Sequence, residues 1–333
     1  MTEAPDALRE AVLRETLHGL TANPRTLAPW LFYDEQGSQL FEQITELPEY
    51  YLTRTERAIF TANASEILAA ASNHAAGSNA SKPSARLTLL ELGAGSATKT
   101  GILLQAAVAR QGSVLYQPID VSSTALDEAA TSIATHIPGV LVEPQVANYL
   151  TEPFTLTRLP GERALALYIG SSIGNFSPQQ ATAILRNLRD HLEPGDSLLL
   201  GTDLAPSAQK SVATLEAAYD DATGITAAFN KNILTRLNRE LDADFNLDRF
   251  AHCARWNAIE SRIEMHLESL VPQTAHIEGQ PFHFNQGETI HTENSYKFSD
   301  AALSTLFTSA SFKPQHTWHD PARSFAVTLA EAI

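Results

Sequence analysis

Two glycines and two carboxylates in the first half of the chain have the types and spacing of a nucleoside-binding site. Gly93 and Gly95 follow the apolar run at residues 87–92, and Glu91 lies in that run just before the turn. Glycine has no Cβ, so the turn can be sharp and its backbone can approach a ligand closely. Asp120 ends a second apolar run, where its carboxylate can accept both hydroxyls of a ribose. These residues predict a nucleoside cofactor at the edge of a parallel sheet.

The residues after the turn separate two kinds of cofactor. A dinucleotide site has a third glycine in G-x-G-x-x-G, but this chain has Thr98 at that place, followed by Lys99. The Glu91 carboxylate would repel a pyrophosphate, whereas it suits a cofactor that carries an ammonium and a sulfonium. The pattern therefore favours S-adenosylmethionine (SAM) over a nicotinamide dinucleotide. A strand-to-helix turn without a ligand is the structural alternative, because a lone G-x-G is weakly specific.

Apolar runs alternate with helical periodicity through the middle of the chain. We expect strands at residues 87–92, 114–120, 140–146, 164–169 and 197–202, with helices near residues 98–109, 123–136 and 178–192. This alternation predicts an α/β fold, in which a Rossmann-like parallel sheet has helices on both faces. Ligands of such sheets bind at the carboxyl ends of the strands.

The flanking segments follow other patterns. Residues 5–70 are expected to be mostly helical, and another helix is expected at residues 230–241. Residues 262–270 alternate apolar and polar side chains, which predicts a half-buried strand. Residues 289–298 and 325–329 are also expected to be extended. We expect these antiparallel strands partly to extend the main sheet and partly to form a second, smaller α+β lobe.

Composition limits the partners of the chain. Its 333 residues are 44% hydrophobic and carry a formal net charge of −15, which is a poor match for the phosphates of nucleic acid. Cys253 is the only cysteine, so no intrachain disulfide can form. No signal-peptide pattern, membrane-span-length apolar run, HExxH or paired CxxC is present. We expect a cytoplasmic, monomeric protein with a small-molecule substrate, no membrane contact and no metal.

Polar residues also follow the strand expected at 164–169. The segment from Gly170 to Asn175 offers backbone donors and an amide at the same sheet edge. An Asn there can hold a substrate carboxylate or amine, and ordinary strand-to-loop chemistry is the alternative. Glu293 and Ser295 point to one face of the strand expected at 289–298, a spacing that alone also fits a solvated face.

Longer blocks of the sequence resemble the histidine-specific, SAM-dependent methyltransferases. The matching blocks, in chain order, are residues 31–34, 37–38, 40–41, 44–56, 91–95, 170–175, 201–204, 219–221, 226–230, 256–257 and 263–265. The resemblance implies a SAM-dependent N-methyltransferase. The pattern is most similar to the members that trimethylate the α-amine of L-histidine to hercynine, the first step of ergothioneine biosynthesis.

The resemblance also implies roles for individual residues. It implies cofactor contacts at Glu91, Gly93, Gly95, Lys99, Asp120, Asn148 and Tyr149. It implies catalytic roles for Tyr33, Gly170 and Asn175. It implies substrate contacts at Tyr33, Tyr50, Gly170, Asn175, Tyr219, Met265, Glu293 and Ser295. In this assignment Asn175 and Tyr219 hold the carboxylate, Tyr50 flanks the imidazole, and Glu293 with Ser295 bonds the imidazole nitrogens.

The same resemblance implies a division of the chain. The expected parts are a helical segment at residues 1–70 that contributes to the substrate site, a SAM-binding domain at 71–205, a substrate-binding lobe at 206–299, and a return to the first domain at 300–333. Two other functions remain open. One is an N-methyltransferase of another amino acid or amino-acid derivative, such as a tryptophan derivative; the other is a SAM-binding regulatory module without activity.

Overall fold

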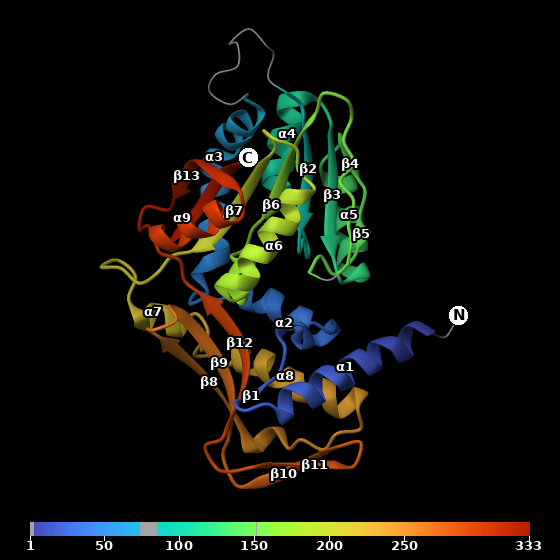
Figure 1. Ribbon diagram of the computed structural model, residues 1–333, viewed down its shortest axis with the longest axis vertical. Helices are drawn as coiled ribbons and strands as arrows, with labels where there is room; N and C mark the ends of the chain where they lie inside the picture. The colour runs from blue at the N-terminus through green and yellow to red at the C-terminus, as the bar shows by residue number, and fades with distance from the viewer. Residues whose placement is uncertain (1–2, 74–84, 151) are drawn as a thin grey trace. The chain divides into compact units, whose positions relative to one another are not determined.

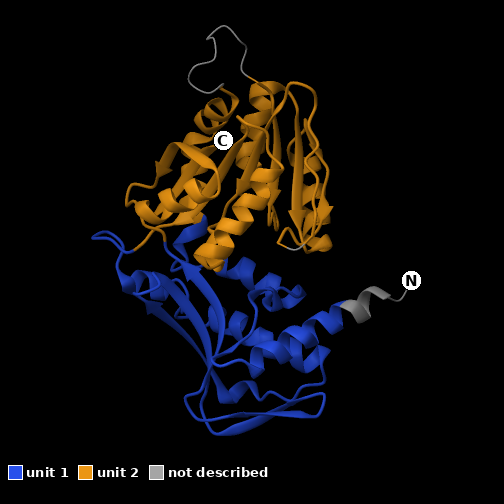
Figure 2. Cartoon of the chain, in the orientation of Figure 1, with its two compact units in different colours: residues 1–53, 206–297 blue, residues 54–205, 298–333 orange. Residues whose placement is uncertain are grey.

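The computed structural model describes residues 3–73, 85–150 and 152–333, with side chains from residue 8 onward. The chain divides into two compact units, which Figure 2 shows in different colours. Unit 1 contains residues 1–53 and 206–297, and unit 2 contains residues 54–205 and 298–333. The segment expected at residues 1–70 is therefore shared by the two units.

Unit 2 is built on an eight-stranded sheet (Figure 1). Its strands are β2 (Leu87–Leu92), β3 (Val114–Asp120), β4 (Val140–Val142), β5 (Gln145–Val146), β6 (Arg163–Tyr168), β7 (Ser197–Asp203), β13 (Phe312–His319) and β14 (Phe325–Ala332). They follow the order β13-β14-β7-β6-β2-β3-β4, and β5 pairs with β3. Strands β2 to β7 pair in parallel, whereas β14 pairs antiparallel with both β7 and β13.

The expected Rossmann-like sheet is thus confirmed. Every residue of β2 is buried, as in a central strand that is covered on both faces. The strand expected at 140–146 is two short strands, and the strand expected at 325–329 extends to Ala332. The helices and 3-10 turn of unit 2 are α4 (Thr100–Gln111), α5 (Ser123–His136), η2 (Ser172–Asn175), α6 (Pro178–Asp190), α9 (Asp300–Ser309) and most of α3 (Tyr51–Ser72).

Local capping explains where two of these helices begin. Ser177 forms a capping box with Gln180, and Pro178 occupies the first turn of α6, where its missing N–H is harmless. The Ser122 hydroxyl accepts a hydrogen bond from the Ala125 N–H at 3.2 Å at the start of α5. These caps start α5 shortly after β3 and α6 shortly after the turn η2.

Unit 1 contains a four-stranded sheet in the order β1-β12-β9-β8. Its strands are β1 (Arg25–Thr26), β8 (Phe250–Asn257), β9 (Arg262–Ser269) and β12 (Thr289–Tyr296), and a separate hairpin joins β10 (Gln273–Ile277) and β11 (Gln280–Phe284). The helices and 3-10 turns are α1 (Glu3–Thr21), η1 (Pro29–Phe32), α2 (Glu35–Thr45), α7 (Val212–Ala217), α8 (Ile225–Glu240) and η3 (Leu247–Arg249). Burial alternates along β9, which confirms the half-buried strand expected there.

Helix α8 begins five residues before the helix expected at 230–241. The Asp221 carboxylate accepts hydrogen bonds from the N–H groups of Ile225 and Thr226, at 3.1 Å and 2.7 Å. These bonds satisfy donors that the first turn of a helix otherwise leaves unpaired. The Thr223 hydroxyl donates to the same carboxylate, and together these bonds hold the pKa of Asp221 well below its usual range, although burial of the carboxyl opposes them.

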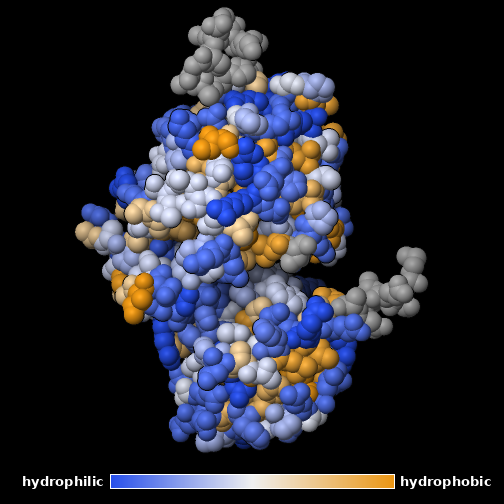
Figure 3. All heavy atoms as spheres, viewed as in Figure 1, coloured by the Kyte–Doolittle hydropathy of each residue, from blue (hydrophilic) through white to orange (hydrophobic). Residues whose placement is uncertain are grey.

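Hydrophilic side chains cover most of the surface of each unit in the view of Figure 3. Among residues 3–73, 85–150 and 152–333, no helix combines the length and apolar character that a bilayer crossing requires. The same residues contain no cluster of three or more His, Cys, Asp or Glu side chains arranged to hold a metal ion.

Candidate functional site

The glycine turn of unit 2 joins β2 to the region before α4. Gly93 and Gly95 have φ angles of 68° and 49°, in the region that side chains disfavour. The Gly93 N–H donates to the Ile119 carbonyl at 2.8 Å, and the Gly95 N–H donates to Asp120 Oδ2 at 2.9 Å. The turn is therefore fastened to the carboxyl end of β3.

Asp120 stands at that end, as the sequence predicts. Its second carboxylate oxygen, Oδ1, accepts a hydrogen bond from the Ser122 N–H at 2.9 Å. Backbone donors thus fix the carboxylate through both oxygens. A carboxylate oxygen has more than one acceptor position, so the group can still accept hydroxyl groups of a ligand.

Glu91 lies inside unit 2, and only 1% of it is exposed. Its carboxylate accepts a hydrogen bond from Thr100 Oγ1 at 2.8 Å and another from the Tyr116 hydroxyl. Burial raises the pKa of Glu91 to about 7, despite both hydrogen bonds. The side chain therefore ties β2 to α4 and β3, and its contact with a cofactor stays a prediction.

The raised pKa of Glu91 predicts how stability depends on pH. The folded protein binds a proton at Glu91 more tightly than the unfolded chain does, because the pKa rises from 4.5 to about 7 on folding. This group should stabilise the fold below pH 4.5, and its contribution, a few kcal/mol, should disappear as the pH rises to about 7. The free energy of unfolding of Glu91→Gln minus that of the wild type should therefore increase over this range, as urea titrations can measure. If the free energies of unfolding of the two proteins changed in parallel with pH, the raised pKa of Glu91 would be refuted.

Two further residues that the resemblance assigns to the cofactor, Asn148 and Tyr149, have different surroundings. The Tyr149 hydroxyl lies 3.3 Å from the Tyr168 hydroxyl, and a Cβ added at Gly93 would lie 3.6 Å from Tyr149 Oη. Tyr149 therefore lies beside the glycine turn. The Asn148 side-chain oxygen accepts a hydrogen bond from the Leu150 N–H at 3.1 Å, so it already serves the loop. Contact of both residues with the cofactor stays a prediction.

Lys99 and Gly170 meet at Glu56, a carboxylate that the sequence reasoning did not identify. Glu56 is on α3 and is fully buried. Its Oε2 lies 2.6 Å from Lys99 Nζ, and its Oε1 accepts from the Gly170 N–H at 2.9 Å. A Cβ at Gly201 would overlap this carboxylate, which explains the glycine in β7. Glu56 thereby links α3, the start of α4 and the loop after β6.

The loop after β6 has the backbone conformation of a tight turn. Gly170 and Ser171 have φ angles of 78° and 58°, and the turn η2 follows directly. The Asp203 N–H donates to Ser171 Oγ at 2.9 Å, which fixes the loop to β7. Gly170 precedes the turn η2 and Asn175 is its last residue, so both lie in the short segment that follows the carboxyl end of β6.

The predicted substrate residues of unit 1 form a row of aromatic rings. The Tyr33 ring meets Phe41 edge-on with 5.9 Å between centroids, and the Tyr50 ring meets Phe41 at 6.4 Å. Tyr50 also meets Tyr219 edge-on at 6.0 Å. Tyr33 has the largest exposed fraction of these predicted tyrosines, at 39%. The structure thus brings together three of the residues that the sequence assigned to the substrate.

Polar groups adjoin this row at Tyr219. The Tyr219 hydroxyl lies 2.7 Å from Ser295 Oγ, and Lys297 Nζ donates to both oxygens at 2.9 Å. Lys297 is buried and was not identified by the sequence reasoning, although it directly follows β12 and continues the alternation of Glu293 and Ser295. The cluster combines an ammonium with two hydroxyl groups, which can bind an anionic or neutral acceptor.

Glu293 lies on the same strand and is buried. Burial raises the pKa of Glu293 to about 7, and the positive charge of Lys297 opposes that rise. Met265 lies opposite Glu293 in the register of β9 and β12. A buried carboxylate beside an apolar side chain suits a planar ring that carries N–H donors.

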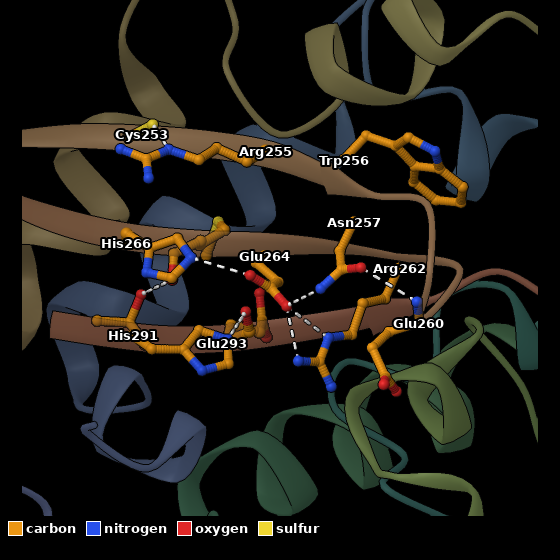
Figure 4. A network of polar contacts seen from close by, with 12 residues as sticks. Cys253, Arg255, Trp256, Asn257, Glu260, Arg262, Glu264, His266, His291 and Glu293 are labelled. Carbon is orange, nitrogen blue, oxygen red and sulfur yellow. Dashed lines mark hydrogen bonds and ion pairs between the residues drawn. The ribbon is translucent and has the colours of Figure 1, made fainter. Parts of the chain in front are cut away.

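A second polar network occupies β8 and β9 (Figure 4). Glu264 accepts hydrogen bonds from Asn257 at 2.9 Å and from Arg262 at 2.8 Å, and these bonds hold its pKa near 2 against the effect of burial. Glu264 is adjacent to Met265 along β9, so the two side chains point to opposite faces of the sheet. The His266 and His291 rings stack on the Glu264 side, with 4.8 Å between centroids. This network stabilises the sheet on the face away from Met265.

Comparison with known proteins identifies the family to which the chain belongs. Residues 12–332 match the profile of a family described as histidine-specific methyltransferase, SAM-dependent. The chain is 41% identical to a histidine N-alpha-methyltransferase of Mycolicibacterium smegmatis, over 98% of this chain and 97% of the relative. It is 39% identical to a histidine N-alpha-methyltransferase of Mycobacterium tuberculosis, over 98% and 96%. It is also 33% identical to ergothioneine biosynthesis protein 1 of Neurospora crassa, over 65% of this chain and 23% of that protein.

Proposed function

The chain belongs to the histidine-specific, SAM-dependent methyltransferase family, and we propose that it adds three methyl groups to the α-amine of L-histidine to give hercynine. It is an enzyme that uses SAM as its methyl donor. The two relatives at 39–41% identity are named for histidine N-alpha-methylation, and the fungal relative is named for ergothioneine biosynthesis. We therefore propose that this chain catalyses the first step of that biosynthesis, in the cytoplasm and as a monomer.

Glu293 is the observation that carries the choice of histidine. Its buried carboxylate lies in a unit that also presents Tyr50 and the cluster of Tyr219 with Ser295. A hydrogen bond from an imidazole N–H to this carboxylate contributes about 1.5–3 kcal/mol, and an apolar amino acid cannot form it, so histidine should bind more tightly. The same site disfavours a large tryptophan derivative, because an indole has one N–H and no second ring nitrogen and so cannot bond both Glu293 and Ser295.

The residues at the ends of β2 and β3 fit SAM. Gly93 and Gly95 have no side chains and adopt positive φ angles, so a ligand can approach the backbone of the turn closely. The fixed Asp120 carboxylate can accept ribose hydroxyls. When bound, the cofactor would supply a methyl group on a positively charged sulfur, so that an N–C bond could form to the methyl carbon as the C–S bond breaks and a neutral thioether leaves. Lys99, Asn148 and Tyr149 are further proposed contacts of the cofactor.

The chain's own residues would act mainly by position and charge. The α-amine must be neutral to attack, so a tyrosine hydroxyl or a water molecule must accept its proton. Orienting the amine can lower the barrier without a covalent intermediate. The ring of Tyr33 can stabilise the cation that forms by about 0.5–2 kcal/mol. Gly170, Asn175 and Tyr219 are proposed contacts of the amine and the carboxylate.

Mass spectrometry of the products tests this function. The purified protein is incubated with SAM and an equal mixture of free amino acids, and a reaction without SAM is the control. Histidine should gain one, two and finally three methyl groups, while tryptophan stays unmodified. Unmodified histidine would refute the function, and a product that stops at one methyl group would refute the trimethylation alone.

A further inference from the structure

A β-bulge in β12 decides which way Glu293 points. His291 pairs with His266 of β9, but Glu293 pairs with Met265, so one residue, Thr292, is extra on β12. In a regular strand His291 and Glu293 would share a face, because side chains alternate with a period of two. The bulge interrupts this alternation and places Glu293 on the face of Met265 and away from the stacked histidines.

Thr292 is anchored where the bulge occurs. Its side chain is buried, and its Oγ1 lies 2.7 Å from Asn230 Oδ1 and 3.1 Å from the Met265 carbonyl oxygen. On the other side of the bulge, His291 Nε2 lies 3.0 Å from the Glu293 carbonyl oxygen. Hydrogen bonds therefore fix the extra residue, Thr292, and also join its two neighbours, His291 and Glu293. Such fixed geometry is expected of a bulge that has a function.

The same hydrogen bonds continue from Asn230 to Tyr219. Asn230 Nδ2 lies 2.8 Å from His252 Nδ1, and His252 Nε2 lies 2.8 Å from the Tyr219 carbonyl oxygen. An imidazole that accepts at Nδ1 and donates at Nε2 is neutral. Burial lowers the pKa of His252, which favours this form. Asn230 is fully buried, and only 2% of the His252 side chain is exposed.

We propose that Thr292, Asn230 and His252 are positioning residues that fix Glu293 relative to Tyr219 and thereby determine the specificity for histidine. The inference rests on the proposed function, in which Glu293 and Tyr219 hold opposite ends of the amino acid. Loss of the anchor would let β12 relax toward regular pairing, and a one-residue change of register turns a side chain to the other face. A carboxylate that points away from the substrate cannot bond the imidazole.

The pair Thr292→Val and Thr292→Ser tests the anchor, because both remove little volume and only the serine keeps the hydroxyl. Thr292→Val should raise the KM of histidine about tenfold, as expected when a buried hydrogen bond is lost. The kcat should change much less, and the affinity for SAM, measured by calorimetry, should stay the same. Thr292→Ser should restore the wild-type KM.

Thr16→Val is the matched control. Thr16 is also fully buried in unit 1, and its hydroxyl donates to the Val12 carbonyl within α1 at 2.7 Å. This change should leave the KM unchanged. An unchanged KM in Thr292→Val would overturn the inference, as would equal KM increases in Thr292→Val and Thr16→Val.

A second variant tests the continuity of the chain of hydrogen bonds and remains informative if Thr292→Val does not fold. His252→Phe keeps a ring but removes both bonding nitrogens, so it should also raise the KM of histidine. Combined with Thr292→Val, the effect should be smaller than the sum of the two free energies, because both changes break one network. Full additivity would refute a shared network. A wild-type protein that does not methylate histidine would instead refute the proposed function, before any variant is compared.

Discussion

Replacement of Glu293 by Ala is expected to raise the KM of histidine by about ten- to a hundredfold and to leave the affinity for SAM unchanged. The carboxylate is buried beside Met265, and it lies on the strand that also carries Ser295 and that Lys297 directly follows. Its oxygens are the acceptors that an imidazole N–H requires. A hydrogen bond to a charged group contributes about 1.5–3 kcal/mol, which corresponds to this change in KM.

Steady-state kinetics with varied histidine and saturating SAM measure this effect, and calorimetry measures SAM binding. Glu268→Ala is the control, since Glu268 is on the neighbouring strand β9 and its carboxylate bonds Arg255 at 2.9 Å. It occupies the same face of β9 as Glu264 and therefore points away from Met265. The control should keep the wild-type KM. An unchanged KM in Glu293→Ala would remove the basis for histidine as the preferred substrate.

The sheet of unit 2 could be predicted from the sequence because its signals are local. Each of the runs at residues 87–92 and 114–120 is apolar and is followed by turn residues, and both are strands with those bounds. The run at 140–146 was less regular, since Glu143 and Pro144 interrupt it, and the structure divides it into two strands there. Pro144 has no N–H for a sheet hydrogen bond, which accounts for the break.

The site was harder to predict because several of its residues depend on distant partners. Glu56 in a helical pattern resembles a solvated carboxylate, but it pairs with Lys99 and with Gly170, far along the chain. Lys297 likewise contacts Tyr219, from another element of unit 1. No periodicity signals such contacts, because they exist only after the fold has formed.

The bulge at Thr292 shows the same limit for a face assignment. Alternation placed Glu293 and Ser295 on one face, which the register confirms. It could not show that this face is opposite to that of His291, since a strand pattern contains no information on an extra residue. That information comes from the hydrogen bonds of Thr292 to Asn230 and the Met265 carbonyl.

Asp120→Ala should weaken SAM binding by about a hundredfold, because two hydrogen bonds from ribose hydroxyls to a carboxylate would be lost. Calorimetry with SAM measures the dissociation constant. Asp127→Ala is the matched control, since this carboxylate is exposed on the following helix α5 and should not affect binding. Thermal unfolding of both variants reports any damage to the glycine turn, because Asp120 also accepts from the Gly95 and Ser122 N–H groups.

A cofactor analogue separates the ribose contact from the effect of Asp120 on the turn. The wild type should bind S-adenosylhomocysteine more tightly than its 2′-deoxyribose analogue, because one hydroxyl donor to Asp120 is missing from the analogue. In Asp120→Ala this preference should disappear, since the acceptor is gone from the protein and the donor from the ligand. If the variant keeps the full preference, Asp120 acts only through the backbone of Gly95 and Ser122, and another residue must hold the ribose.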